Sequence, residues 1–153
     1  MLIIGIAGGS GSGKTTVVKK ITEKLPESSV SIISQDAYYW DNGHLSPEAK
    51  KQINFDHPDS IEWELLISHL DTLISGKAID MPTYSYVNYA RGQETIYIEP
   101  KRVIIVEGIL ILTNEQLRDR FNMKVFVDAD AVDAPVLLRA ELDGGTVNGG
   151  TLV

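Results

Sequence analysis

The sequence predicts an α/β fold in which helices flank a parallel sheet, with a small β-hairpin insertion. Short apolar, β-branched runs recur along the chain, and amphipathic helical patterns separate them. A glycine-rich stretch, AGGSGSGKTT, follows the first run directly. Continuous apolar runs of this length are typical of strands buried on both faces, as in parallel sheets. The predicted strands are Leu2–Ala7, Val30–Ser34, Val103–Val106 and Val125–Val127.

Three segments between these runs carry a helical pattern. The first is Lys14–Leu25, and the short third is Asn114–Arg120. We expect the second to start near Asp59, because Glu62 follows three residues later as in a capping box, and to end at Gly76. Its expected apolar face consists of Ile61, Leu65, Leu66, Leu70, Leu73 and Ile74.

Two segments interrupt the alternation of strand and helix. Residues 81–100 are aromatic and strand-like without a helical period, which predicts a β-hairpin insertion. The second segment is residues 131–153, an atypical tail that is acidic and rich in glycine. The predicted domain is therefore residues 1–130. Such a tail has little apolar surface to bury and is typical of disordered segments.

The composition excludes several classes of protein. The net charge of −7 argues against a broad nucleic-acid-binding face, which needs basic excess. The absence of cysteine excludes disulfides and thiolate metal sites, and the three histidines show no zinc-ligand spacing. No apolar run approaches the roughly 20 residues of a membrane span. The first run leads straight into the glycine motif, so we interpret it as a strand and expect a cytoplasmic protein, with a homo-oligomer left open.

The glycine-rich stretch is a complete match to GxxxxGK[ST], the phosphate loop of P-loop NTPases. Its glycines let successive backbone N–H groups point at a phosphate, while Lys14 reaches the β- and γ-oxygens. The hydroxyl of Thr15 is the expected Mg²⁺ ligand. The alternative interpretation is a flexible turn that binds no ligand, but the strand–loop–helix context favours binding of ATP or GTP with Mg²⁺. The predicted nucleotide-binding residues are Gly8, Gly9, Ser10, Gly11, Ser12, Gly13, Lys14, Thr15 and Thr16.

Two carboxylates follow predicted strands. Glu107 lies just past one apolar run and Asp36 just past another, so in a parallel sheet both emerge at the edge that carries the phosphate loop. An acid there can hold Mg²⁺ directly or through water, or can accept a proton from an attacking hydroxyl. The alternative role for Asp36 is a helix cap or a turn residue.

The stretch NFDHPDS and several aromatic residues suggest an acceptor site. Asp56 could bind sugar hydroxyls, because a carboxylate accepts two hydrogen bonds at once. Asp59 fits the role of a helix cap better than that of a ligand-binding residue, and His57 fits that of a turn residue. Several aromatics could line an acceptor pocket, although apolar packing is their commoner use. They are Tyr38, Tyr39, Trp40, Tyr84, Tyr86 and Tyr89.

These motifs together resemble the uridine kinase (uridine/cytidine kinase) family of P-loop kinases. GGSGSGKTT, SQDAYY, NFDHPDS, PTYSYVNYARGQET and VIIVEGILIL occur in that family's order over about residues 1–130. The resemblance implies ATP- or GTP-dependent phosphorylation of the 5′-hydroxyl of a nucleoside. By match of motif, it implies that Asp36 is the catalytic base and that Thr15 and Glu107 are associated with Mg²⁺. It also implies that Asp56 binds the ribose and that Tyr84 lies beside the nucleobase.

Two departures from the family pattern leave alternatives open. Five residues after Tyr84 the family carries a histidine that contacts the pyrimidine, and here Tyr89 stands there, so uridine, cytidine or another acceptor remain open. After VFVDAD the family continues with an arginine-rich lid, whereas this chain looks truncated or altered, with Arg139 the sole candidate counterpart. Transition-state arginines contribute about 10³–10⁵ in rate. The alternatives are therefore an active kinase, an impaired nucleotide-binding remnant, or a P-loop kinase of another small alcohol.

Overall fold

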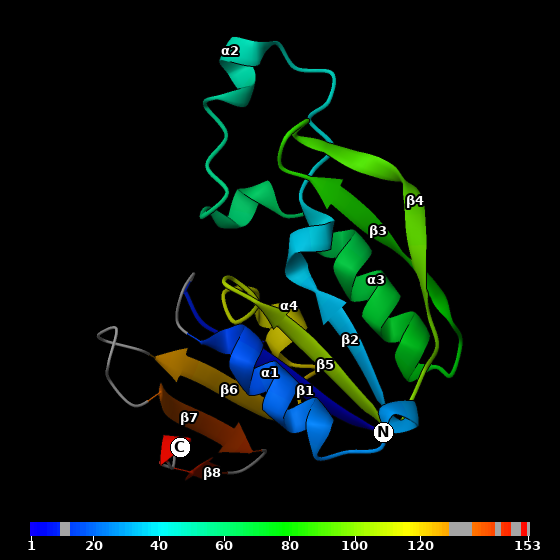
Figure 1. Cartoon of the computed structure of the whole chain (residues 1–153), viewed down its shortest axis with the longest axis vertical. Helices are drawn as coiled ribbons and strands as arrows, with labels where there is room; N and C mark the ends of the chain where they lie inside the picture. Colours follow the sequence, from blue (N-terminus) through cyan, green and yellow to red (C-terminus); the bar gives the residue numbers. More distant parts are fainter. Residues whose placement is uncertain (10–12, 129–135, 143–144, 148–150, 153) are drawn as a thin grey trace. The chain divides into compact units, whose positions relative to one another are not determined.

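The computed structural model describes residues 1–9, 13–128, 136–142, 145–147 and 151–152. The chain divides into two compact units (Figure 1). We call Met1–Ile33 together with Lys101–Val153 the sheet unit, and Ser34–Pro100 the hairpin unit.

The sheet unit is built on four strands that the sequence predicts. They are β1 (Leu2–Ala7), β2 (Val30–Ser34), β5 (Val103–Gly108) and β6 (Met123–Asp128), in the order β2-β5-β1-β6. Strand β1 pairs in parallel with both β5 and β6, and Ile6 lies opposite Glu107 in the β1–β5 register. The α/β prediction is therefore confirmed, and the predicted phosphate loop follows a central strand.

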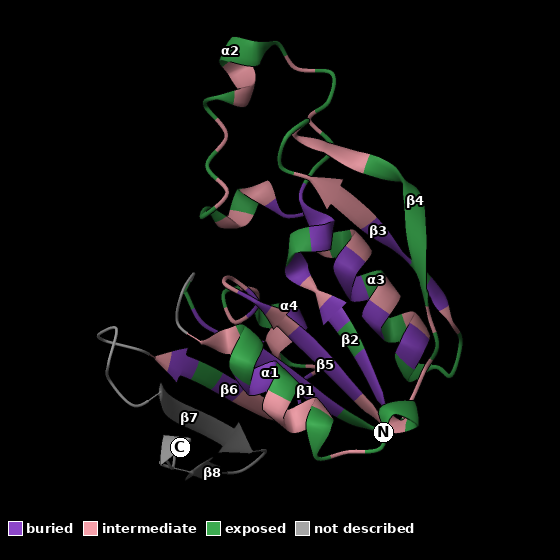
Figure 2. Cartoon of the chain, viewed as in Figure 1, coloured by how far each residue is buried: buried purple, intermediate pink, exposed green. Residues whose placement is uncertain are grey.

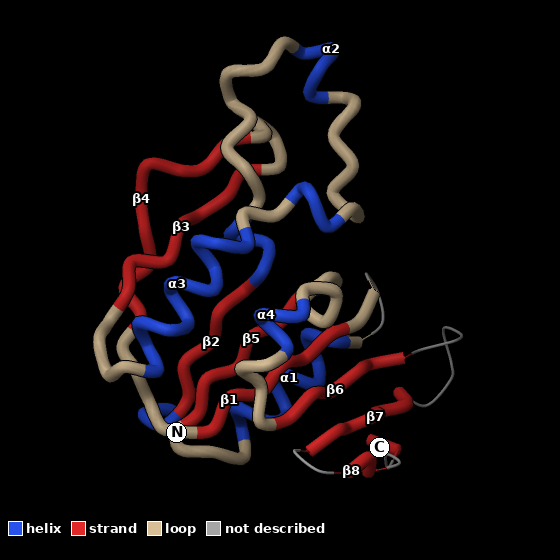
Figure 3. The backbone as a smooth tube through the Cα atoms, turned by 180° about the vertical axis from the view of Figure 1, so that it is seen from behind, coloured by secondary structure: helices blue, strands red, loops and turns tan. Residues whose placement is uncertain are grey.

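Helices cover both faces of this sheet. Helix α1 (Lys14–Glu23) lies on one face and α4 (Glu115–Arg118) on the other, as the front and rear views show (Figures 1 and 3). Helix α4 is shorter than predicted and begins where the Asn114 side chain accepts a hydrogen bond of 3.0 Å from the Leu117 amide. The 3₁₀ turn η1 (Glu27–Ser29) links α1 to β2. The core on the α1 face contains Ile4, Ile6, Val17, Val18, Val30, Ile105, Val125 and Val127.

Part of the tail forms strands, where the sequence predicted none. Strand β7 (Val136–Leu142) pairs antiparallel with β6, and β8 (Gly145–Val147) and β9 (Thr151–Leu152) both pair with β7. An exposed strand edge offers unpaired backbone groups, which any nearby extended segment can satisfy. The prediction of disorder for the rest of the tail falls outside the described residues.

The hairpin unit contains the predicted insertion. Strands β3 (Ile79–Ser85) and β4 (Ala90–Ile98) form an antiparallel hairpin, with an irregular register between Pro82 and Tyr84. The prediction of a hairpin over residues 81–100 is thus confirmed, although the two strands begin at Ile79 and end at Ile98. The remaining elements are η2 (Gln35–Tyr38), α2 (Pro47–Lys50), η3 (Pro58–Ser60) and α3 (Trp63–Ile74).

The predicted start of the second helix is wrong. Asp59 belongs to η3, and α3 begins at Trp63 without a side-chain cap. The Asp59 amide donates to His57 Nδ1 at 3.1 Å, and the Trp63 indole donates to the Pro58 carbonyl at 2.8 Å, so local side-chain bonds stabilise a separate turn here.

The apolar face of α3 also differs from the prediction. Ile67 is buried, whereas Leu65 is only half-buried and Ile74 is exposed. Buried and exposed segments alternate along α3 (Figure 2). Gly76 ends the helical segment as predicted, with a φ of 90° that suits glycine. The buried residues of the helix are Leu66, Ile67, Leu70 and Leu73. Within the described ranges, no helix has the length and apolar character needed to span a membrane.

Candidate functional site

The predicted phosphate loop joins β1 to α1 in the sheet unit. Gly13, immediately before α1, has a φ of 91° and a ψ of 12°, a left-handed conformation that glycine adopts without steric penalty. The first turn of α1 contains no acidic residue, and Gly13 has no side chain with which to cap the helix. The first amides of α1 and its positive end therefore suit an anion. Ser10, Gly11 and Ser12 lie outside the described residues.

Two of the predicted site residues form an ion pair. Lys14 Nζ lies 2.9 Å from Glu107 Oε2, and the two side chains are only 14% and 20% exposed. Lys14 is the first residue of α1, the helix that follows β1. Glu107 lies near the end of β5, which pairs with β1. Because this pair is shielded from water, its attraction exceeds that of a typical surface salt bridge.

The sheet-unit residues fit a nucleotide that arrives with its metal. Among the described residues, no group of three or more histidine, cysteine or acidic side chains could form a metal site alone. Magnesium in nucleotide sites keeps several waters and is held by one or two carboxylates and the substrate phosphates. The carboxylate of Glu107 and the hydroxyl of the exposed Thr15 would supply a donor set of this size, and Thr16 is also exposed.

The hairpin unit contains an aromatic cluster made of Tyr39, Phe55, Tyr84, Tyr86 and Tyr89. The ring centroids of Tyr39 and Tyr84 are 5.3 Å apart, and those of Phe55 and Tyr86 are 5.4 Å apart. Phe55 and Tyr89 are stacked with an interplanar angle of 27°. The structure thus brings together the predicted residues Tyr84 and Tyr89.

Tyr89 has an unusual backbone conformation for its residue type. Its φ of 54° makes it the one described residue other than glycine with a positive φ. Such a conformation costs roughly 1–3 kcal/mol and persists where the surroundings hold it. The Tyr89 carbonyl accepts a hydrogen bond of 2.9 Å from the Asn42 amide, and its ring stacks on Phe55.

Asp36 is exposed in the turn η2, directly after β2, between the buried residues Gln35 and Ala37. Its carboxylate accepts a side-chain hydrogen bond from Tyr86, which also bonds with Tyr39. Partial burial, followed by the charge of Asp36, raises the pKa of Tyr86, which therefore stays protonated and donates. In the sequence, Tyr86 is only one aromatic residue among several. The alternation Tyr84-Ser85-Tyr86 is a signal that could have linked it to the cluster.

Asp56 is exposed in the turn before η3. Its amide donates to the side-chain oxygen of Asn54 at 3.0 Å, which holds the turn closed. Burial and then the charge of Asp36 raise the pKa of Tyr39 to about 12, and Asp56 adds to this shift. Both predicted carboxylates of the hairpin unit therefore act on the same tyrosine.

Tyr38 has a structural role rather than a place in an acceptor pocket. It is fully buried, and its hydroxyl lies 2.8 Å from His69 Nδ1. Burial, followed by the charge of Arg91, lowers the pKa of His69, so the imidazole that hydrogen-bonds with this hydroxyl is neutral. Arg91 itself forms an ion pair with Glu62. Trp40, by contrast, is 46% exposed.

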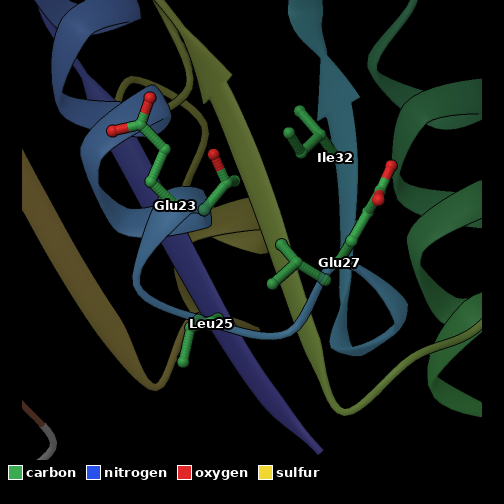
Figure 4. Close-up of a pocket in the computed structure, with 6 residues that line it drawn as sticks. Glu23, Leu25, Glu27 and Ile32 are labelled. Carbon is green, nitrogen blue, oxygen red and sulfur yellow. The ribbon is translucent and has the colours of Figure 1, made fainter.

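A separate hollow of about 480 Å³ lies near the far end of α1 (Figure 4). Glu23 and Glu27 contribute carboxylates to it, and Leu25 and Ile32 contribute apolar surface. The ten residues of α1 place it about 15 Å from Lys14. None of the predicted site residues lines this hollow.

Comparison with known proteins connects these features to a family. The Phosphoribulokinase / Uridine kinase family matches residues 3–133. A uridine kinase of Halalkalibacterium halodurans is 52% identical over 130 residues, 85% of this chain and 62% of that protein. A uridine kinase of Staphylococcus haemolyticus is 50% identical over 141 residues, 92% of this chain and 68% of that protein.

This chain therefore spans about two thirds of the length of these relatives. Among solved structures, a possible uridine kinase from Bacillus stearothermophilus has the same fold, with a TM-score of 0.65 and 23% identity. The similarity covers 84% of this chain and 71% of that one. The family match includes the phosphate loop, the whole hairpin unit and Glu107. The chain belongs to the Phosphoribulokinase / Uridine kinase family.

Proposed function

We propose that this chain is a nucleoside kinase that transfers the γ-phosphoryl group of ATP or GTP to the 5′-hydroxyl of uridine or cytidine. The observation that carries the phosphoryl-transfer chemistry is the Lys14–Glu107 pair beside a complete phosphate-loop motif. The nucleoside acceptor is supported by about 50% identity to uridine kinases and by the aromatic cluster.

The sheet unit holds the phosphate donor in this proposal. The Lys14 ammonium binds the β- and γ-phosphate oxygens, and the amides at the start of α1 bind the same groups. Thr15 and Glu107 hold Mg²⁺, which when bound neutralises the charge that develops on the phosphates. These residues supply position and charge, which is the main demand of phosphoryl transfer.

The hairpin unit holds the acceptor in this proposal. Asp36 accepts the proton of the attacking 5′-hydroxyl. Asp56 binds the ribose hydroxyls, because a carboxylate accepts two hydrogen bonds at once. Tyr84 packs its aromatic face against the pyrimidine ring. Tyr89 belongs to the same cluster and presents a phenol, so the ratio of uridine to cytidine turnover reports on this residue.

Nucleoside-dependent release of ADP from Mg-ATP tests the proposal. We expect release with uridine or cytidine, and little with pantothenate or ribulose 5-phosphate. Asp36→Asn should lower kcat by about 10²–10⁴ while ATP still binds, because the amide cannot take the proton. The matched control is Asp119→Asn, an exposed carboxylate in the sheet unit.

Each contrary result points to a defined alternative. ATP binding without nucleoside-dependent release would contradict the kinase and support a nucleotide-binding remnant. Release that depends on another small alcohol would contradict the nucleoside assignment alone. Near-normal turnover of Asp36→Asn would remove Asp36 from the role of base.

A further inference from the structure

Lys14 and Glu107 form an ion pair, but each of them binds a different partner once a nucleotide is bound. The proposed function, on which this inference rests, gives Lys14 to the phosphates and Glu107 to the metal. In the structure the two charges lie 2.9 Å apart and are mostly shielded from water, so each neutralises the other. The pair must therefore loosen, or gain a third charge, when a nucleotide binds.

The charge balance differs with and without a divalent cation. A metal-free triphosphate approaches a lysine whose charge is already compensated, and it meets the Glu107 carboxylate at close range. Like charges in such a shielded site repel strongly. A divalent cation bound with the nucleotide supplies Glu107 with a new partner, which leaves the full charge of Lys14 to the phosphates.

We propose that Glu107 makes nucleotide binding conditional on Mg²⁺, because it neutralises Lys14 until a divalent cation takes the lysine's place. Glu107 then excludes metal-free nucleotide, which cannot react productively, from the phosphate loop. The coupling is reciprocal: Mg²⁺ raises the affinity for ATP by the same factor by which ATP raises the affinity for Mg²⁺. Coupling between two ligands is typically about 5–150-fold.

Calorimetric titration of ATP, with excess Mg²⁺ and with EDTA, tests this inference. In the wild type, we expect Mg²⁺ to tighten ATP binding by a factor within that range. In Glu107→Gln, metal-free ATP should bind on the order of 10-fold more tightly than in the wild type, and the Mg²⁺ enhancement should shrink to a few-fold. Glu23→Gln is the matched control, because Glu23 lies on α1 but pairs at 3.9 Å with the exposed Lys19.

A second measurement guards against a variant that merely misfolds. Metal-free tripolyphosphate should raise the thermal unfolding midpoint of Glu107→Gln more than that of the wild type, since the variant presents an uncompensated lysine. Glu107→Ala should change in the same direction. These comparisons need no turnover, so they report on the ion pair alone.

The outcomes separate the inference from the proposed function. ATP binding with an equal Mg²⁺ enhancement in wild type and Glu107→Gln would overturn the coupling and leave the kinase proposal intact. The coupling is also overturned if tripolyphosphate stabilises both proteins equally. Failure of the wild type to bind ATP in either condition would instead overturn the proposed function, and the inference with it.

Discussion

Asp36 is exposed, yet its carboxylate accepts a hydrogen bond from Tyr86, a residue of the turn between β3 and β4. A hydrogen bond to a charged group contributes roughly 1.5–3 kcal/mol. Tyr86 is itself placed by ring contacts with Tyr39 and Tyr84, at centroid distances of 5.8 Å and 5.4 Å. The aromatic cluster therefore orients the proposed base.

Replacing Tyr86 by phenylalanine removes this donor and keeps the ring contacts. We expect kcat to fall on the order of 10-fold, because the carboxylate loses the bond that orients it. ATP affinity should not change. Tyr97→Phe is the control, since Tyr97 is 66% exposed on β4. Steady-state kinetics with nucleoside as the varied substrate give the measurement, and an unchanged kcat would exclude this positioning role.

The candidate site residues that the sequence indicates are those that belong to a motif or follow a predicted strand. Lys14 follows from the phosphate-loop motif, and Glu107 from its place at the end of an apolar run. The partnership of Tyr86 with Asp36 could not be predicted, because it joins residues 50 positions apart through the conformation of a turn. The ion pair of Arg91 with Glu62 has the same long-range origin.

Close packing against the sheet limits which side chains β1 can carry. A Cβ added to Gly5 would lie 2.5 Å from the Phe121 ring, which follows α4. Gly5 is thus needed for the approach of this ring to the face of the sheet opposite α1. Neighbouring Ile4 and Ile6 point into the α1 face instead, as strand alternation requires.

Gly5→Ala should therefore destabilise the protein by about 1–3 kcal/mol, as overpacking of a core does. Urea unfolding followed by circular dichroism measures the change. The double variant Gly5→Ala with Phe121→Leu should recover part of the loss relative to the sum of the two single variants. Strict additivity of the two losses would contradict the contact.

Element boundaries show what sequence patterns can and cannot predict. The strands were predictable because burial on both faces selects continuous apolar runs such as Val103–Val106. The start of α3 was not, because the bond from Trp63 to the Pro58 carbonyl stabilises a separate 3₁₀ turn. Strand β7, which pairs antiparallel with β6, was missed because the acidic residues and glycines around it indicated a tail with little apolar surface to bury.

The chain folds as two compact units, and Ser34–Pro100 forms one of them, whereas the sequence indicated only a hairpin insertion over residues 81–100. This unit contains the aromatic cluster, Asp36 and Asp56, and the sheet unit contains Lys14 and Glu107. The stability of the hairpin unit depends in part on His69, which is neutral beside Tyr38.

Stability should fall as the pH falls below about 6.5, the pKa of histidine in an unfolded chain. Burial and Arg91 lower the pKa of His69 in the folded state, so the unfolded chain binds a proton first and is favoured. Urea midpoints at about pH 7.5 and about pH 5.5 test this. The difference should shrink in His69→Gln and persist in His44→Gln. An undiminished difference in His69→Gln would contradict it.

The proposed activity of this chain is the phosphorylation of a pyrimidine nucleoside. The most direct measurement incubates protein of this sequence with Mg-ATP and uridine, and identifies the product by ³¹P NMR. We expect uridine 5′-monophosphate from the wild type and none above background from Lys14→Ala, which loses its contact with the transferred phosphate. Equal product from both proteins, or ATP binding with no monophosphate from uridine or cytidine, would contradict it.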